Sequence, residues 1–156
     1  MTNQTEQREE PVGAKVFFQK VRDIDRQIAV KYEQLLRLNA LSTKVTASLD
    51  GEGHGGGGVS RSMENGVMQI VALQEELEQD IEGYTSLYRQ ANAILRRMED
   101  TKERVCLEHR YLLGRTWEEI AEEMNLTRQW VAIVHGQALK DADEIISRDF
   151  TKLASN

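Results

Sequence analysis

The stretch TWEEIAEEMNLTRQWVAIVHGQAL, residues 116–139, decides the fold of the C-terminal part of this chain. Thr116 is followed three residues later by Glu119, which is the spacing of a capping box at the start of a helix. Asn125 tolerates the left-handed backbone that a tight turn requires. Thr127 is then placed to cap a second helix. The pattern predicts two helices joined by a sharp turn, a helix-turn-helix.

The apolar residues of this stretch recur at the offsets that two closely crossing helices need. Ala121 supplies a small side chain at the crossing, and Leu126 fills the space beneath the turn. Val131 and Val134 hold the second helix on the first. The predicted core of the stretch consists of Ile120, Ala121, Met124, Leu126, Val131 and Val134.

The opposite face of the second helix carries few charges. Arginine can bind guanine or a phosphate, glutamine pairs bidentately with adenine, and alanine or isoleucine contacts the thymine methyl group. A glycine on this face lets a backbone approach closely. The face predicts base reading in a major groove, and the alternative is a three-helix module that binds only protein. Its residues are Arg128, Gln129, Ala132, Ile133, Gly136 and Gln137.

The chain before this module predicts two long amphipathic helices within residues 14–99, after a polar N-terminus over residues 1–13 that we expect to be disordered. Apolar residues recur at steps of three and four. The first stripe comprises Phe17, Val21, Ile24, Ile28, Tyr32, Leu35 and Leu38; the second comprises Val67, Ile70, Leu77, Ile81, Tyr84, Tyr88, Ala91, Leu95 and Met98.

A glycine-rich segment, residues 49–60, separates the two predicted long helices. It reads as a flexible linker, since a phosphate-binding loop needs a preceding strand and a Lys-Ser/Thr pair, and the sequence has neither here. Two such helices either fold back as a hairpin or pair between chains as a coiled-coil dimer, and the sequence leaves both open. We therefore expect an all-α protein with the helix-turn-helix domain over residues 100–149 and a flexible tail over residues 150–156.

Composition narrows the class of function. The formal net charge is −6, so the chain is not a generic basic nucleic-acid binder. No apolar run approaches the roughly 20 residues that cross a bilayer. The single cysteine, Cys106, suits a reducing compartment, which predicts a cytoplasmic protein. The histidines, His54, His109 and His135, fit no Ser-His-Asp, Cys-His or metal-ligand spacing, so we expect neither an enzyme nor a cofactor.

The segment YLLGRTWEEIAEEMNLTRQWVAIVHGQALKDADEI resembles the fourth region of bacterial housekeeping sigma factors, which reads promoters. The resemblance implies that Arg128 and Gln129 contact bases and that Arg115 and Thr116 meet the phosphate backbone. The chain departs from the sigma pattern at Gln129, Ala132 and Gln137, where that pattern has glutamate, arginine and lysine. The positions that match are Thr116, Glu118, Glu119, Thr127, Arg128, Ala138 and Leu139.

The whole chain is similar to phage-encoded late transcription regulators of the ArpU and RinA type, which share a long helical front, a variable polar loop, a restart like SMENGV and a sigma-like C-terminus. This similarity implies a protein of a bacterial host's phage or prophage that activates late or packaging genes.

The module over residues 100–149 is itself acidic, with seven Lys/Arg and eleven Asp/Glu. Arg110, Arg115, Arg128 and Lys140 are the cations that we expect near DNA. Few phosphate contacts predict weak non-specific binding, so we expect dimerisation or contact with RNA polymerase to raise the affinity. Two other functions fit the same layout. One is a small terminase subunit that recognises packaging DNA, and the other is an adaptor that binds only RNA polymerase.

Overall fold

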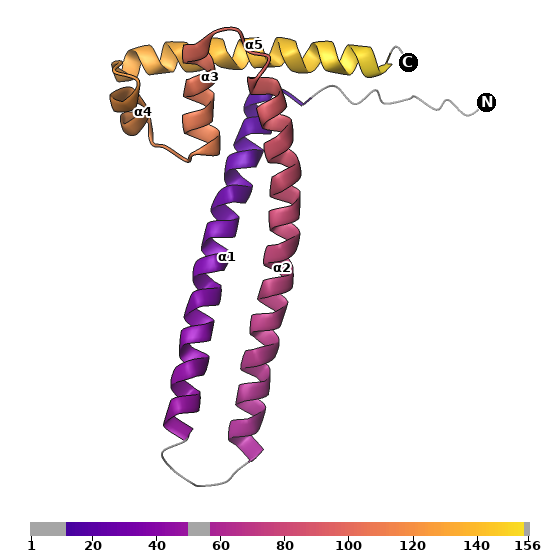
Figure 1. Cartoon of the computed structure of the whole chain (residues 1–156), viewed down its shortest axis with the longest axis vertical. Helices are drawn as coiled ribbons and strands as arrows, with labels where there is room; N and C mark the ends of the chain where they lie inside the picture. The colour runs from indigo at the N-terminus through magenta and orange to yellow at the C-terminus, as the bar shows by residue number, and fades with distance from the viewer. Residues whose placement is uncertain (1–11, 50–56, 155–156) are drawn as a thin grey trace, which may run out of the picture. The chain divides into compact units, whose positions relative to one another are not determined.

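The computed structural model describes residues 12–49 and 57–154, and every regular element in these ranges is helical. This confirms the predicted all-α class. The chain divides into two compact units: residues 23–87 form one, and the residues up to 22 together with those from 88 onward form the other. In chain order (Figure 1) the elements are α1 (Ala14–Leu49), α2 (Gly57–Leu95), α3 (Thr101–Leu107), the π-helical turn η1 (Glu108–Leu112), α4 (Trp117–Glu123) and α5 (Arg128–Ala154).

In the unit of residues 23–87, α1 and α2 form an antiparallel hairpin (Figure 1). Leu35 and Leu77 are its most buried apolar side chains. Lys31 Nζ lies 2.6 Å from Asp80 Oδ2 and 3.4 Å from Glu76 Oε2, so a charged cluster joins the two helices. Buried and half-buried residues recur every three or four positions on both helices, as in coiled-coil packing. They are Ile24, Ile28, Lys31, Leu35 and Leu38 on α1, and Ile70, Leu73, Leu77, Asp80, Tyr84 and Leu87 on α2.

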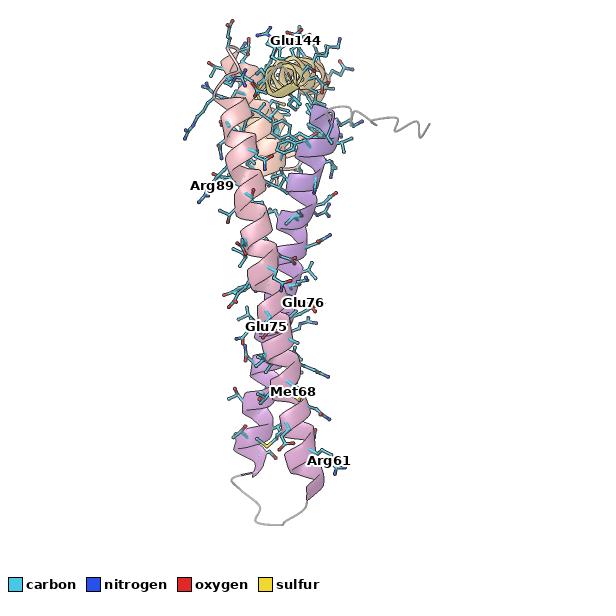
Figure 2. All side chains as sticks on the ribbon, turned by 90° about the vertical axis from the view of Figure 1, so that its right-hand side faces the viewer. Arg61, Met68, Glu75, Glu76, Arg89 and Glu144 are labelled. Carbon is cyan, nitrogen blue, oxygen red and sulfur yellow. The ribbon has the colours of Figure 1, made fainter. Side chains whose placement is uncertain are left out.

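The observed seam differs in part from the predicted stripes. Tyr32, Val67 and Ile81 are 55%, 53% and 46% exposed, whereas the seam takes Leu73 and Leu87 instead. A pair of helices buries only one narrow strip on each, so an apolar residue one position away from the strip remains on the flank. Arg61, Met68 and Glu75, labelled in Figure 2, lie on the side of α2 that faces away from α1. All three are exposed.

In the other unit, α3, α4 and α5 form a three-helix cluster (Figure 1) whose core matches the prediction. Ile120, Ala121 and Val131 are buried together with Cys106, and burial raises the pKa of the Cys106 thiol to about 11. The partly buried residues Trp117, Met124, Leu126 and Val134 pack around them.

The ends of the long helices complete this unit. Phe18, Val21 and Leu95 are at most 1% exposed, and the ring of Phe18 lies 5.5 Å from that of Tyr111. The backbone N–H of Ala14 donates a 2.6 Å hydrogen bond to an Asp143 carboxylate oxygen on α5. The compact unit is therefore larger than the domain predicted over residues 100–149, because Phe18 packs on Tyr111 and the Ala14 backbone is hydrogen-bonded to Asp143.

Element boundaries also differ from the predicted ones. α1 runs to Leu49 and α2 starts at Gly57, so the predicted loop of residues 49–60 is shorter, and its residues 50–56 lie outside the described residues. α5 continues to Ala154, past the domain end predicted at residue 149. The disorder predicted for residues 1–13 falls almost wholly outside the described residues, as do the last two residues of the predicted tail.

Candidate nucleic-acid interface

The helix-turn-helix consists of α4, a turn and the start of α5. Thr116 Oγ1 accepts a hydrogen bond from the Glu119 backbone N–H at 3.2 Å, and Glu119 Oε2 accepts one from the Thr116 backbone N–H at 2.7 Å. The predicted capping box is thus confirmed, and the hydrogen bonds that the Thr116 backbone N–H and hydroxyl donate to the Glu119 carboxylate lower the pKa of Glu119. Thr127 Oγ1 accepts from the Trp130 backbone N–H at 3.2 Å, so Thr127 caps α5 as predicted.

One residue with a left-handed backbone precedes α4 and another follows it, and the sequence predicts the second, Asn125. Gly114 has φ = 67° and ends the preceding helix, while Asn125 has φ = 54° and forms the turn. The turn is closed by the Leu126 backbone N–H, which donates to the Ala121 carbonyl oxygen at 2.8 Å. Because Val131 and Ala138 are then almost fully buried, the rotation of α5 about its own axis is set.

The rotation of α5 exposes the predicted reading residues. Ile133 is 60% exposed, and a Cβ added to Gly136 would meet no atom within 4 Å. The absence of a side chain at Gly136 is therefore not required by the chain's own packing. We call the exposed side of the first three turns of α5 the recognition face; it comprises Arg128, Gln129, Trp130, Ala132, Ile133, Gly136 and Gln137, and Lys140 is exposed one turn beyond it.

Trp130 is the one residue of the recognition face that is not among the residues predicted for it. Its side chain is 56% exposed, one helical turn before Ile133. The signal was present in the sequence: once Val131 and Val134 take the core side, a residue one position before Val131 must lie about 100° away from it around the helix. An exposed tryptophan is unusual, because its large apolar surface is on average mostly buried.

Two polar residues of the recognition face, Arg128 and Gln137, are held by carboxylates of the same unit. Arg128 Nη1 lies 2.7 Å from Glu118 Oε1, and both side chains are 64% exposed. The Gln137 side-chain amide donates a 3.0 Å hydrogen bond to Asp141 Oδ1. Arginine and glutamine are thus oriented in advance, but a bound duplex has to compete with these acids.

Arg115 and Thr116 lie at the start of α4, apart from the recognition face in the chain. Arg115 Nε lies 3.2 Å from Glu123 Oε1, and His109 Nδ1 lies 2.5 Å from the other oxygen of that carboxylate. The Thr116 backbone N–H and hydroxyl are both bonded to Glu119. A phosphate that accepts from Arg115 Nε or from either Thr116 donor therefore replaces a glutamate oxygen.

Arg110, which we expect near DNA, packs against the start of α4. Its guanidinium carbon lies 4.1 Å from the centre of the Trp117 ring, and Nη1 donates to the Arg115 carbonyl oxygen at 3.1 Å. The same ring contacts His135, whose Nε2 lies 2.8 Å from the Tyr111 hydroxyl oxygen. Burial, followed by the charges of Arg110 and Lys15, lowers the pKa of His135, and its ring packs against Tyr111 of η1 and Trp117 of α4.

The described residues, 12–49 and 57–154, contain neither a metal-ion site nor a membrane-spanning helix. No group of three or more His, Cys, Asp or Glu side chains is arranged to hold a metal ion there. None of the helices in these ranges combines the length and the apolar character needed to cross a membrane.

Comparison with known proteins agrees with this geometry. No curated protein and no solved structure matches the chain. Residues 100–141 match the family model described as Sigma-70, region 4, which covers 42 of the 156 residues and includes α3, η1, α4 and the start of α5. The C-terminal module of this chain is therefore sigma-like, a helix-turn-helix of a kind that binds DNA.

Proposed function

We propose that this protein is a sequence-specific, DNA-binding transcriptional regulator that inserts α5 into the major groove. The observation that carries the proposal is the recognition face, whose exposed residues include Gln129 and Ile133 while Val131 and Ala138 lock the reverse side of the same helix. Because the helix cannot rotate, the same set of side chains always faces the DNA bases. The proposal includes no catalytic activity and no cofactor.

The charge of the module shapes how it binds. It carries seven Lys/Arg against eleven Asp/Glu, and Arg128 and Arg115 are both paired with glutamates. Few phosphates are then neutralised, so non-specific affinity is low and depends weakly on salt. Affinity for a target must come from base contacts and from assembly of more than one recognition face.

Self-association through the hairpin of α1 and α2 supplies that assembly in our proposal. Tyr32 and Leu36 of α1 are 55% and 53% exposed, and Val67 and Val71 of α2 are 53% and 45% exposed. A second copy that covers these flanking side chains places two recognition faces on one duplex and raises avidity through effective concentration. In this proposal, contact with RNA polymerase at a promoter also raises the apparent affinity for DNA.

We place this regulator in the cytoplasm of a bacterial host and assign it to the late or packaging genes of a phage. The support is the arrangement of a long helical front, a polar loop and a sigma-like module, which is similar to regulators of the ArpU and RinA type. The gene context is tested by footprinting on the genome that encodes the chain.

The proposed function is tested by selecting bound duplexes from a random library with the full chain and measuring their affinity by gel shift. Arg128→Ala and Gln129→Ala should each cost roughly 1–3 kcal/mol of specific binding, because each removes a base contact. Arg148→Ala is the matched control, since Arg148 is a 68% exposed arginine on the same helix, paired with Glu144 and well beyond the recognition face.

Two results would redirect the proposal. If neither Arg128→Ala nor Gln129→Ala weakens binding, the chain is better explained as an adaptor that binds RNA polymerase. If light scattering gives a ring of many subunits, the same helix-turn-helix serves a small terminase subunit that loads packaging DNA.

A further inference from the structure

Two large apolar side chains stand on the recognition face. Trp130 is 56% exposed and Ile133 is 60% exposed, and they lie three residues apart on α5. Ala132 is exposed between them. The adjoining Val131 is only 1% exposed. The buried side of this helix therefore includes Val131 but neither Trp130 nor Ile133.

A major groove offers an apolar side chain one apolar group, the C5 methyl of thymine. Three residues along a helix rise about 4.5 Å, close to the spacing of successive base pairs in B-DNA, which is about 3.4 Å. Side chains one turn apart therefore reach adjacent or nearly adjacent base pairs. Trp130 also lies in the first turn of α5, the part of a recognition helix that contacts base edges.

The polar neighbours of Trp130 and Ile133 favour the same base pair. Gln129 and Gln137 lie on this face, and a glutamine amide pairs bidentately with adenine N6 and N7. The partner of that adenine is thymine, whose methyl group lies in the same groove. Amide and apolar side chains on one face thus select A·T pairs jointly, and this agreement favours a duplex over an apolar protein partner.

We propose that Trp130 and Ile133 determine specificity by contacting thymine methyl groups, so that the target contains thymines at two neighbouring positions. This inference rests on the proposed function and deepens it, because it names the base pairs that the recognition face selects. In this proposal Trp130 and Ile133 make base contacts that arginine and lysine make in many recognition helices. The recognition face therefore carries few charges.

The test replaces thymine by uracil, which removes the methyl group and keeps every hydrogen-bonding atom. A duplex selected by the wild-type chain is synthesised with dT or dU at each thymine position. The wild-type chain should bind about fourfold more weakly for each recognised methyl that is lost, the value expected from one buried methyl-sized group. Ile133→Ala and Trp130→Ala should each abolish the difference between dT and dU at one position.

Leu113→Ala is the matched control, because Leu113 is 58% exposed but precedes α4, and it should keep the full discrimination. If the wild-type chain binds the selected duplex specifically and equally well with dT and dU at every position, the inference is overturned and the proposed function stands. If no duplex is enriched from the library, both are overturned. The wild-type comparison decides the question even where a variant folds poorly.

Discussion

Arg128 Nη1 lies 2.7 Å from Glu118 Oε1, so the first residue of the recognition helix is bound by a carboxylate of the helix before it. The pair joins α4 to α5 across the turn and holds the guanidinium in one orientation. Both side chains are 64% exposed, so the pair contributes little to stability, and in the proposed function Glu118 competes with DNA for Arg128.

Glu118→Gln should therefore strengthen DNA binding. The substitution releases Arg128 and removes one negative charge next to the duplex. The free energy of an exposed ion pair that no longer has to be broken corresponds to roughly a two- to fivefold gain in affinity. Fluorescence anisotropy at two salt concentrations measures the gain, which should shrink at the higher one. Glu122→Gln on the same helix removes the same charge and serves as the control. An equal gain in both variants would show that only net charge matters.

The Lys31–Asp80 pair is expected to set the register of the hairpin. Its side chains are 27% and 28% exposed within an otherwise apolar seam, and the hydrogen bond to Asp80 raises the pKa of Lys31. Lys31→Ala or Asp80→Ala should lower Tm, because each leaves one charge in the seam without its partner. Lys31→Leu with Asp80→Leu should restore or raise Tm, measured by circular dichroism. Arg37→Ala, at a 79% exposed position, is the control and should leave Tm unchanged.

Leu36→Glu should disrupt self-association without unfolding the hairpin, since Leu36 is 53% exposed and outside the seam. A charge at this flank has to be desolvated when a second copy covers it. Size-exclusion chromatography with light scattering should report the mass of one chain, and DNA affinity should fall at least tenfold through lost avidity. Gln34→Glu, also exposed on α1, is the control for charge. If the wild-type protein already has the mass of one chain, the proposed self-association through the hairpin is wrong.

Glu103 predicts a pH dependence of stability. Burial, followed by Asp141 and Asp100, raises the pKa of its carboxyl group from 4.5 to about 7. Between these values the folded chain keeps a proton that the unfolded chain has released, so this group's contribution to stability falls as pH rises from about 4.5 to about 7. Glu103→Gln should flatten that part of the profile and stabilise the protein at pH 8 by on the order of 1 kcal/mol.

Denaturant unfolding across this pH range measures the effect of Glu103→Gln. Glu99→Gln, at an exposed position just before α3, should keep the wild-type profile. A Glu103→Gln profile parallel to that of the wild type would show that Glu103 has an ordinary pKa.

Gly114→Ala should destabilise the helix-turn-helix by about 1–2 kcal/mol. Gly114 has φ = 67°, a region where a Cβ clashes with its own backbone, although no other atom lies within 4 Å of the added Cβ. The cost is therefore one of backbone conformation alone. Gly136→Ala has the same open surroundings with helical backbone and should leave stability unchanged or slightly raised, by thermal unfolding.

The sequence by itself determined the helix-turn-helix. Interactions within a few residues set the helix caps at Thr116 and Thr127 and the left-handed backbone at Gly114 and Asn125. A single crossing of two helices sets the core around Ile120 and Val131. Such short-range rules are readable from spacing alone, so both the motif and most of its exposed face could be predicted.

Only the tertiary structure decided which apolar residues are buried where several choices satisfy the same periodicity. Tyr32 and Trp130 are exposed, whereas Lys31 enters the hairpin seam and Phe18 closes the core of the C-terminal unit. It also paired Arg128 with Glu118. The physical reason is that a helix repeat defines a face only to within one residue, and the position of the partner helix then selects which strip of that face loses its water.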